Sequence, residues 1–203
     1  MKTKHLAILT IPILLLMHSC VVPDSRYVEP TFYLLGSIDG DKNETDFDSE
    51  YSFYLKGIEL PKYLDDSRMI FRPNEIEIKF RENHRWGEPL EEGIARSIGL
   101  YLGKELKTLT YSVYPHRRKS IADMDIFVSV QNFEKVSADK VRLRATIDLS
   151  FMGDGAKVFS FDEYFLVRGN GGESQEVRAM DQAIHSLAKA IARNKANSKQ
   201  ISE

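Results

Sequence analysis

An acidic stretch ahead of the second predicted strand carries residue types that bind calcium. Asp39, Asp41, Asn43 and Glu50 stand at the first, third, fifth and twelfth positions of a calcium loop. The sixth position, which needs glycine for its sharp turn, holds Glu44, and the flanking segments read as strands rather than helices. A solvated acidic loop without a metal ion is the preferred interpretation, and calcium binding is the alternative.

Other constellations that could perform chemistry are incomplete. Gly169-Asn170-Gly171-Gly172 lies between a predicted strand and a predicted helix but lacks the lysine and hydroxyl residue of a phosphate-binding loop. His84, His116 and His185 have no spacing to one another or to a cysteine that suits metal binding. No glycine-flanked serine elbow is present. The sequence therefore predicts no enzyme, no metal site and no cofactor.

Cys20, the only cysteine, points to a different chemistry. Lys2 and Lys4 precede an apolar run that is too short to span a bilayer stably. Leu16-Met17-His18-Ser19-Cys20 then resembles the lipobox of bacterial lipoproteins, in which the cysteine is acylated and becomes the mature N-terminus. We predict a signal peptide over residues 1–19 and lipidation of Cys20. The alternative is an ordinary signal peptide or a transmembrane anchor with an incidental cysteine.

The residues after Cys20 indicate where the mature chain resides. Val21 is not an aspartate, and by the sorting rule of enteric bacteria this directs a lipoprotein to the outer membrane, here facing the periplasm. Residues 20–30 read as a lipidated tether, and ten extended residues reach roughly 33 Å. Removing 19 of 203 residues leaves 184, enough for one domain with a core. The mature net charge of 26 − 30 = −4 gives no reason to expect a nucleic-acid partner.

Alternation of apolar and polar residues predicts several strands. The clearest is Val141 to Leu149, where every second residue is apolar. The pattern Ile126, Val128, Val130 before it and the segment from Lys157 to Val167 after it complete a predicted antiparallel meander. Strict alternation implies that one face of the sheet is exposed to solvent, so helices should cover the other face. Further strands are predicted over Thr31–Leu35, Ser52–Leu60, Arg68–Phe71 and Glu75–Phe80.

Two segments have helical periodicity. The first starts at Pro89, a residue pre-set for the first helical position, and its apolar stripe is Leu90, Ile94, Ile98, Leu102 and Leu106. Small residues beside this stripe predict close approach of another backbone; they are Ala95, Gly99 and Gly103.

The second helix is predicted from Glu173 to Ala196. The order of elements predicts an α+β fold with a mixed, largely antiparallel sheet and two helices packed on one face. We expect a single domain over residues 31–196, followed by a disordered tail over residues 197–203.

Two surface features have competing interpretations. Trp86, just before Pro89, either packs beneath the helix start or anchors a partner. The basic run His116-Arg117-Arg118-Lys119 is most simply a solvated loop, and the alternative is contact with an acidic partner surface or lipid phosphate.

Taken in order behind the lipobox, several short motifs make the chain resemble the PqiC family of ABC-type transport auxiliary lipoproteins. The resemblance covers Tyr33 to Ala192 and is sharpest at Arg85-Trp86-Gly87-Glu88-Pro89-Leu90. Leu60-Pro61-Lys62-Tyr63-Leu64-Asp65 and Tyr114-Pro115 also fit. The acidic insertion and Gly87, where the family more usually has alanine, depart from the pattern.

The resemblance implies a role beside MCE-domain proteins, which form hydrophobic lipid tunnels across the periplasm. It implies that this lipoprotein docks such a tunnel at the outer membrane, bound to the lipids there through its acyl anchor, and that a homo-oligomer forms. Expected partner-binding residues are Trp86, Pro89, Leu90, Tyr63, Arg117 and Arg118. The alternatives are a structural or assembly lipoprotein that handles no lipid and, more distantly, a lipid-anchored hydrolase.

Overall fold

The computed structural model describes residues 28–36, 46–115, 121–152, 158–169 and 171–200. The signal peptide, Cys20, most of the acidic loop, Arg117 and Arg118 lie outside the described residues. The elements are β1 (Thr31–Tyr33), β2 (Phe53–Glu59), the 3₁₀ turn η1 (Lys62–Leu64), β3 (Arg68–Phe71), β4 (Lys79–Trp86), α2 (Leu90–Glu105), β5 (Tyr111–Val113), β6 (Met124–Ser137), β7 (Lys140–Phe151), β8 (Val158–Arg168) and α3 (Glu173–Gln200).

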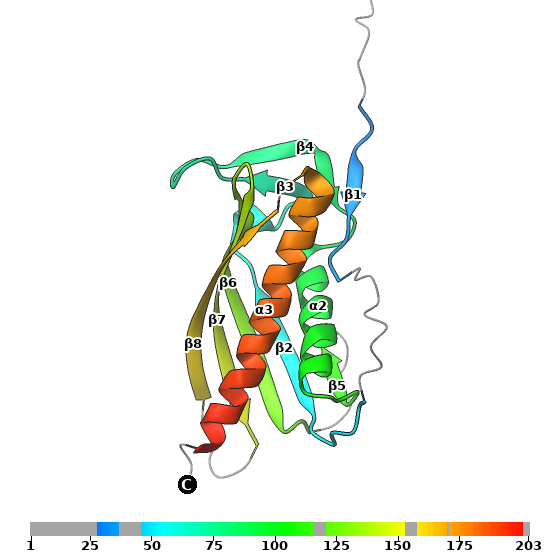
Figure 1. The fold of residues 1–203 in the computed structure, drawn as a ribbon, viewed down its shortest axis with the longest axis vertical. Helices are drawn as coiled ribbons and strands as arrows, with labels where there is room; N and C mark the ends of the chain where they lie inside the picture. The colour runs from blue at the N-terminus through cyan, green and yellow to red at the C-terminus, as the bar shows by residue number, and fades with distance from the viewer. Residues whose placement is uncertain (1–27, 37–45, 116–120, 153–157, 170, 201–203) are drawn as a thin grey trace, which may run out of the picture.

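The described strands form one mixed, eight-stranded sheet (Figure 1). Its long ladders are antiparallel and join β6 to β7 and β7 to β8, which confirms the predicted meander. The other edge of β6 is shared, because its first half pairs with β2 and Lys135 near its end pairs with β3. Consequently β5 extends the sheet from β2 at one end of the molecule, while β4 and β1 extend it from β3 at the other.

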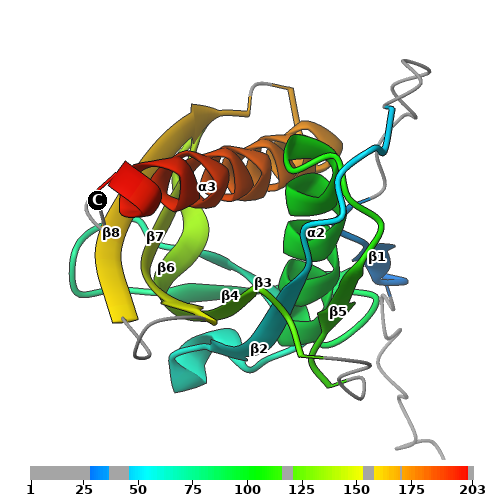
Figure 2. The same ribbon diagram turned by 90° about the horizontal axis from the view of Figure 1, so that it is seen from below.

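Both helices cover the same side of this sheet, as predicted. Figure 2 shows α3 within the curve of β6, β7 and β8, with α2 beside it. The inward residues of β7, from Val141 to Leu149, are at most 1% exposed and face α3 residues such as Ile184 and Leu187. The alternation on β7 and the helical stripe on α3 therefore close the core together.

α3 continues to Gln200, four residues beyond the predicted end at Ala196. Residues 186–200 contain no glycine or proline to stop a helix. None of the helices in the described part of the chain is long and apolar enough to cross a membrane.

The strand predicted over Glu75–Phe80 is misplaced, because β4 begins only at Lys79 and continues to Trp86. Asn74 closes a turn there, since its side-chain oxygen accepts hydrogen bonds from the backbone N–H groups of Ile76 and Glu77. Ile76 is 96% exposed and belongs to that turn rather than to a half-buried strand. The polar β4 holds its place because it pairs with β1 on one side and β3 on the other.

The small-residue stripe on α2 receives mainly side chains, and backbone approaches it only at Gly103, where an added methyl group would lie 3.1 Å from the Thr108 carbonyl oxygen. A methyl group added at Gly99 would lie 2.7 Å from a Val113 methyl carbon, and one at Gly103 would lie 3.0 Å from the Tyr111 ring. Both neighbours belong to β5, a short strand that the sequence patterns do not predict. The glycines therefore let β5 press its side chains against α2.

We expect Gly99→Ala to lower the melting temperature. Alanine gains about 1 kcal/mol of helix propensity, but overpacking against Val113 costs roughly 1–3 kcal/mol. Gly93→Ala is the matched control in the same helix, because its new methyl would meet only the movable end of Glu88 at 3.0 Å. Thermal melts followed by circular dichroism compare the two. Equal stability of the two variants would contradict the tight β5 contact.

Candidate functional site

A cleft of about 390 Å³ lies where β4 turns into α2. Its walls are residue 60, residues 64–67 around the end of η1, and residues 86–91, and we call it the α2 cleft. The wall formed by residues 86–91 is held in place by the sheet, since Trp86 N–H donates to the Ser67 carbonyl and Gly87 N–H donates to the Tyr33 carbonyl. Pro89 caps α2 with φ −52° and gives up no intrahelical hydrogen bond.

The α2 cleft combines an apolar floor with an acidic rim. Leu60, Leu64, Trp86 and Leu90 supply apolar surface, and every charged residue that lines it is an aspartate or a glutamate. Such a cleft suits an apolar side chain flanked by a basic group.

The rim carboxyls sit in different electrostatic surroundings. Hydrogen bonds from Arg68 lower the pKa of Asp66 to about 2. Burial raises the pKa of Glu91 from its usual value, and the nearby charges of Asp65 and Glu92 add to that shift. Glu88 pairs instead with Arg96 on the next turns of α2.

Of the four expected partner-binding residues that the structure describes, Trp86, Pro89 and Leu90 border the α2 cleft and Tyr63 does not. Trp86 is only 6% exposed and its ring stacks on Phe133 of β6, with ring centroids 6.5 Å apart. Leu90 is buried as well, whereas Pro89 is exposed. Tyr63 points away from the cleft toward β6, where its hydroxyl donates to the Gln131 carbonyl at 3.0 Å. Trp86 is therefore a core residue that also borders the cleft.

Tyr63 leads to a buried charge cluster that the sequence patterns do not reveal. The Glu134 side chain is 0% exposed and accepts hydrogen bonds from Arg72 Nε and Arg142 Nη2, both at 2.9 Å. The Tyr63 hydroxyl shares its one proton between the Gln131 carbonyl and the other Glu134 oxygen, each at 3.0 Å, and Asn132 Nδ2 donates at 3.1 Å to the oxygen that the arginines bind. A carboxylate so enclosed is stable only while these donors stay in place.

A second buried carboxylate, Glu176, holds the start of α3. Arg81 of β4 donates to both of its oxygens at 2.9 and 2.8 Å, and Lys135 of β6 donates at 3.0 Å. Arg81 also reaches Glu173 at 3.1 Å. Both glutamates stand in the first turn of α3, where the helix dipole favours negative charge, and ion pairs to β4 and β6 add to that effect.

The end of the molecule farthest from β1 has a different character. Exposed apolar side chains from separate segments gather there, where β2, β5 and β6 begin and β7 ends. Each is more than half exposed, and together we call them the distal end: Leu109, Ile121, Met152 and Val158.

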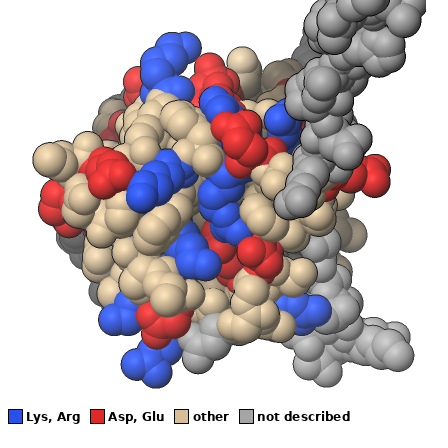
Figure 3. Space-filling model, turned by 90° about the horizontal axis from the view of Figure 1, so that it is seen from above, with Lys and Arg blue, Asp and Glu red and all other residues tan. Residues whose placement is uncertain are grey.

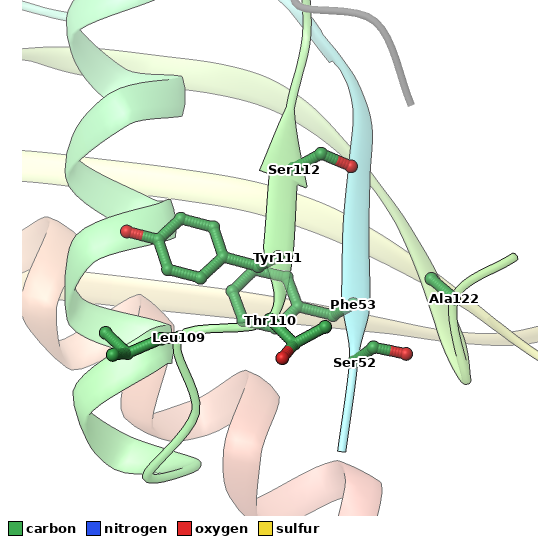
Figure 4. Close-up of a pocket in the computed structure, with 7 residues that line it drawn as sticks. All are labelled: Ser52, Phe53, Leu109, Thr110, Tyr111, Ser112 and Ala122. Atoms are coloured by element: carbon green, nitrogen blue, oxygen red, sulfur yellow. The ribbon is translucent and has the colours of Figure 1, made fainter. Parts of the chain in front are cut away.

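A pocket of about 220 Å³ adjoins the distal end (Figure 4). Leu109 and Ala122 belong to its wall, as do Phe53 and Tyr111, whose rings stack with centroids 4.9 Å apart. The distal end therefore offers exposed apolar side chains beside a shallow, partly apolar hollow.

Within the described residues, no group of three or more His, Cys, Asp or Glu side chains is placed to hold a metal ion. Asp39, Asp41, Asn43 and Glu44 lie outside the described residues, and Glu50 is exposed. In the glycine-rich connection, Gly171 and Gly172 have φ of +106° and +97°, which only glycine adopts readily. That connection turns the chain from β8 into α3.

An α+β domain with two helices on one face of a mixed sheet does not by itself define a function. The sequence profile of ABC-type transport auxiliary lipoprotein components matches residues 33–192, and the chain belongs to that family. This confirms the resemblance seen in the short motifs.

Two crystal structures share the fold. One, of an uncharacterised protein, is 14% identical with a TM-score of 0.67, and the match covers 82% of this chain and 99% of that one. Protein XCC0632 from Xanthomonas campestris is 15% identical with a TM-score of 0.62, covering 86% and 97%. At such identities the likeness concerns the fold alone. No curated protein sequence matches the chain.

We expect Trp86→Ala to lower the melting temperature strongly. Removing a buried aromatic side chain of this size costs about 3–5 kcal/mol, and the stacking on Phe133 is lost with it. Phe32→Ala is the matched control, because Phe32 is an exposed aromatic residue and its removal should change stability by less than about 0.5 kcal/mol. Thermal or urea unfolding measures both. An unchanged melting temperature for Trp86→Ala would contradict its place in the core.

Proposed function

We propose that this chain is the outer-membrane lipoprotein component of an intermembrane lipid-transport system and that it docks an MCE-domain tunnel protein. Membership in the transport auxiliary lipoprotein family supports the transport part. The observation that carries the docking part is the distal end, with Leu109, Ile121, Met152 and Val158 exposed. Exposed apolar residues gathered at one end of a domain are a feature of protein association sites.

The direction of the chain supports this arrangement. β1, which follows the proposed lipid anchor at Cys20, lies at one end of the long axis, and the distal end lies at the other (Figure 1). A domain held by its N-terminal side in the outer membrane would direct the distal end into the periplasm. A tunnel arriving from the inner membrane would meet that end first.

The proposed role is docking, with no bond made or broken. The lipoprotein would hold the tip of the tunnel near the outer membrane so that lipid passes between the membranes. In a homo-oligomer several distal ends would bind one tunnel, and such multivalency strengthens a contact that is weak in each copy.

The anchor has its own test. We expect Cys20→Ser to move the protein from the outer-membrane fraction to the soluble periplasmic fraction, because the residue that would be acylated is gone. Fractionation followed by immunoblotting measures this, with an unrelated outer-membrane lipoprotein as the internal control. A variant that stays in the outer-membrane fraction would exclude Cys20 as the anchor.

The docking proposal predicts that the full lipoprotein co-purifies with the MCE-domain protein of the same bacterium. Leu109→Glu and Ile121→Glu together should weaken this binding at least about tenfold, because charges would be buried in an apolar contact. Ile76→Glu is the matched control, since Ile76 is 96% exposed in the turn between β3 and β4 at the opposite end. All variants should melt as the wild-type protein does.

Two results would count against the proposal. If the wild-type lipoprotein binds no MCE-domain protein, the transport role fails and a structural role in the cell envelope takes its place. If the wild-type protein binds but the distal variants bind equally well, docking uses a different surface.

A further inference from the structure

β1 carries an exposed apolar surface that neither the core nor the distal end uses. Val28, Phe32 and Leu34 are 49–61% exposed, whereas Leu35 is buried and Tyr33 is half-buried. Phe32 lies in β1, Val28 precedes the strand, and Leu34 follows its last residue directly. We call Val28, Phe32 and Leu34 the β1 patch.

A guanidinium group borders the patch. Phe32 lies opposite Arg85 in the β1–β4 ladder, so the two side chains share one face of the sheet. In the described part of the chain, Arg85 makes one hydrogen bond, from Nε to the Glu82 carbonyl at 3.2 Å. Its charge adds to the hydrogen bonds of Arg68 in lowering the pKa of Asp66. An apolar surface fringed by an arginine suits the boundary between acyl chains and phosphate groups.

The length of the preceding chain decides what this patch meets. Val28 is eight positions after Cys20, and eight fully extended steps span at most about 29 Å. With Cys20 acylated, β1 can never move far from the lipid surface. This confinement gives the patch a high effective concentration at the lipid surface, so a weak apolar contact is enough. A protein partner on this face would need to enter the narrow space between the domain and the lipid layer.

The charges at this end add no strong bias. Figure 3 shows the end face that carries β1, on which Lys and Arg side chains are interspersed with Asp and Glu. Apolar contact rather than net charge must therefore supply the attraction, and a zwitterionic lipid layer should suffice.

We propose that the β1 patch lies in the interfacial region of the lipid layer that holds the anchor. This inference rests on the proposed lipid anchor at Cys20. Acylation alone would leave the domain free to tumble on its tether. With Phe32 and its neighbours in the lipid surface, the domain stands with its long axis away from the membrane and its distal end toward the periplasm.

The experiment attaches the mature chain to vesicles chemically. Cys20 is the only cysteine, so its thiol can be coupled to a maleimide-headgroup lipid in phosphatidylcholine vesicles, with or without bromine on the acyl chains. Phe32→Trp is the reporter and Leu109→Trp, at the distal end, is the matched control. The native Trp86 is buried in both and gives a common background. Bromine quenches only tryptophan that contacts the acyl chains.

We expect the emission added by Phe32→Trp to be largely lost in brominated vesicles, and the emission added by Leu109→Trp to be retained. Val28→Trp should be quenched like Phe32→Trp. Equal emission from Phe32→Trp in both kinds of vesicle would overturn the proposal. So would a blue shift that grows with protein density without quenching, because a second copy would then cover the patch.

The outcome is independent of tunnel docking, because the vesicles contain no MCE-domain protein. It is also independent of natural acylation, which the coupling replaces. Failure of the lipid contact and failure of the proposed function are therefore distinguishable.

Discussion

The burial of the Glu134 carboxylate is the constraint on which the end of the molecule that holds η1, β3 and β4 depends. A carboxylate withdrawn from water loses several kcal/mol of hydration, and that loss is offset only by donors in good geometry. Those donors come from separate segments: Arg72 follows β3, Arg142 belongs to β7, and Tyr63 belongs to η1. The cluster therefore adds side-chain links from η1, β3 and β7 to β6, beside the ladders that already pair β3 and β7 with β6. Replacing one donor would leave a charge unpaired in the interior, so these segments cannot drift independently.

The same logic extends through Glu176 to the rest of that end. Arg81 and Lys135 bind its carboxylate, which joins the first turn of α3 to β4 and β6. β4 in turn carries β1 on its outer edge. The α2 cleft and the β1 patch lie on or beside the short strands β1, β3 and β4. Backbone ladders and buried residues such as Met69 and Trp86 hold these strands, and the ion pair of Arg81 with Glu176 ties β4 to α3 as well.

These dependencies explain what the sequence could and could not predict. The alternation on β7 and the stripes on α2 and α3 are local patterns, and they predict both helices and the meander. In the Glu134 cluster, Tyr63 is 71 positions and Arg72 is 62 positions away from Glu134 in the sequence. No local pattern predicts contacts over such separations. One signal was present: inward apolar residues on β6 are even-numbered to Val130 but resume at Phe133, which indicates the register shift found there. β5 is too short to show a periodic pattern. Only Gly99 and Gly103 on α2 indicate that another segment packs closely there.

The two ends of the molecule are connected by a densely packed unit, so the orientation of one end determines that of the other. β6 and β7 run the length of the domain, with the Glu134 cluster near one end and the distal end at the other. α3 lies along them and buries its apolar stripe over much of its length. A densely packed unit of this kind transmits orientation because it has few internal degrees of freedom. If the β1 patch fixes one end against lipid, the distal end is held at a set height and angle rather than only within reach of a tether. A docking surface oriented in this way loses less rotational freedom on binding, and that lowers the free-energy cost of association.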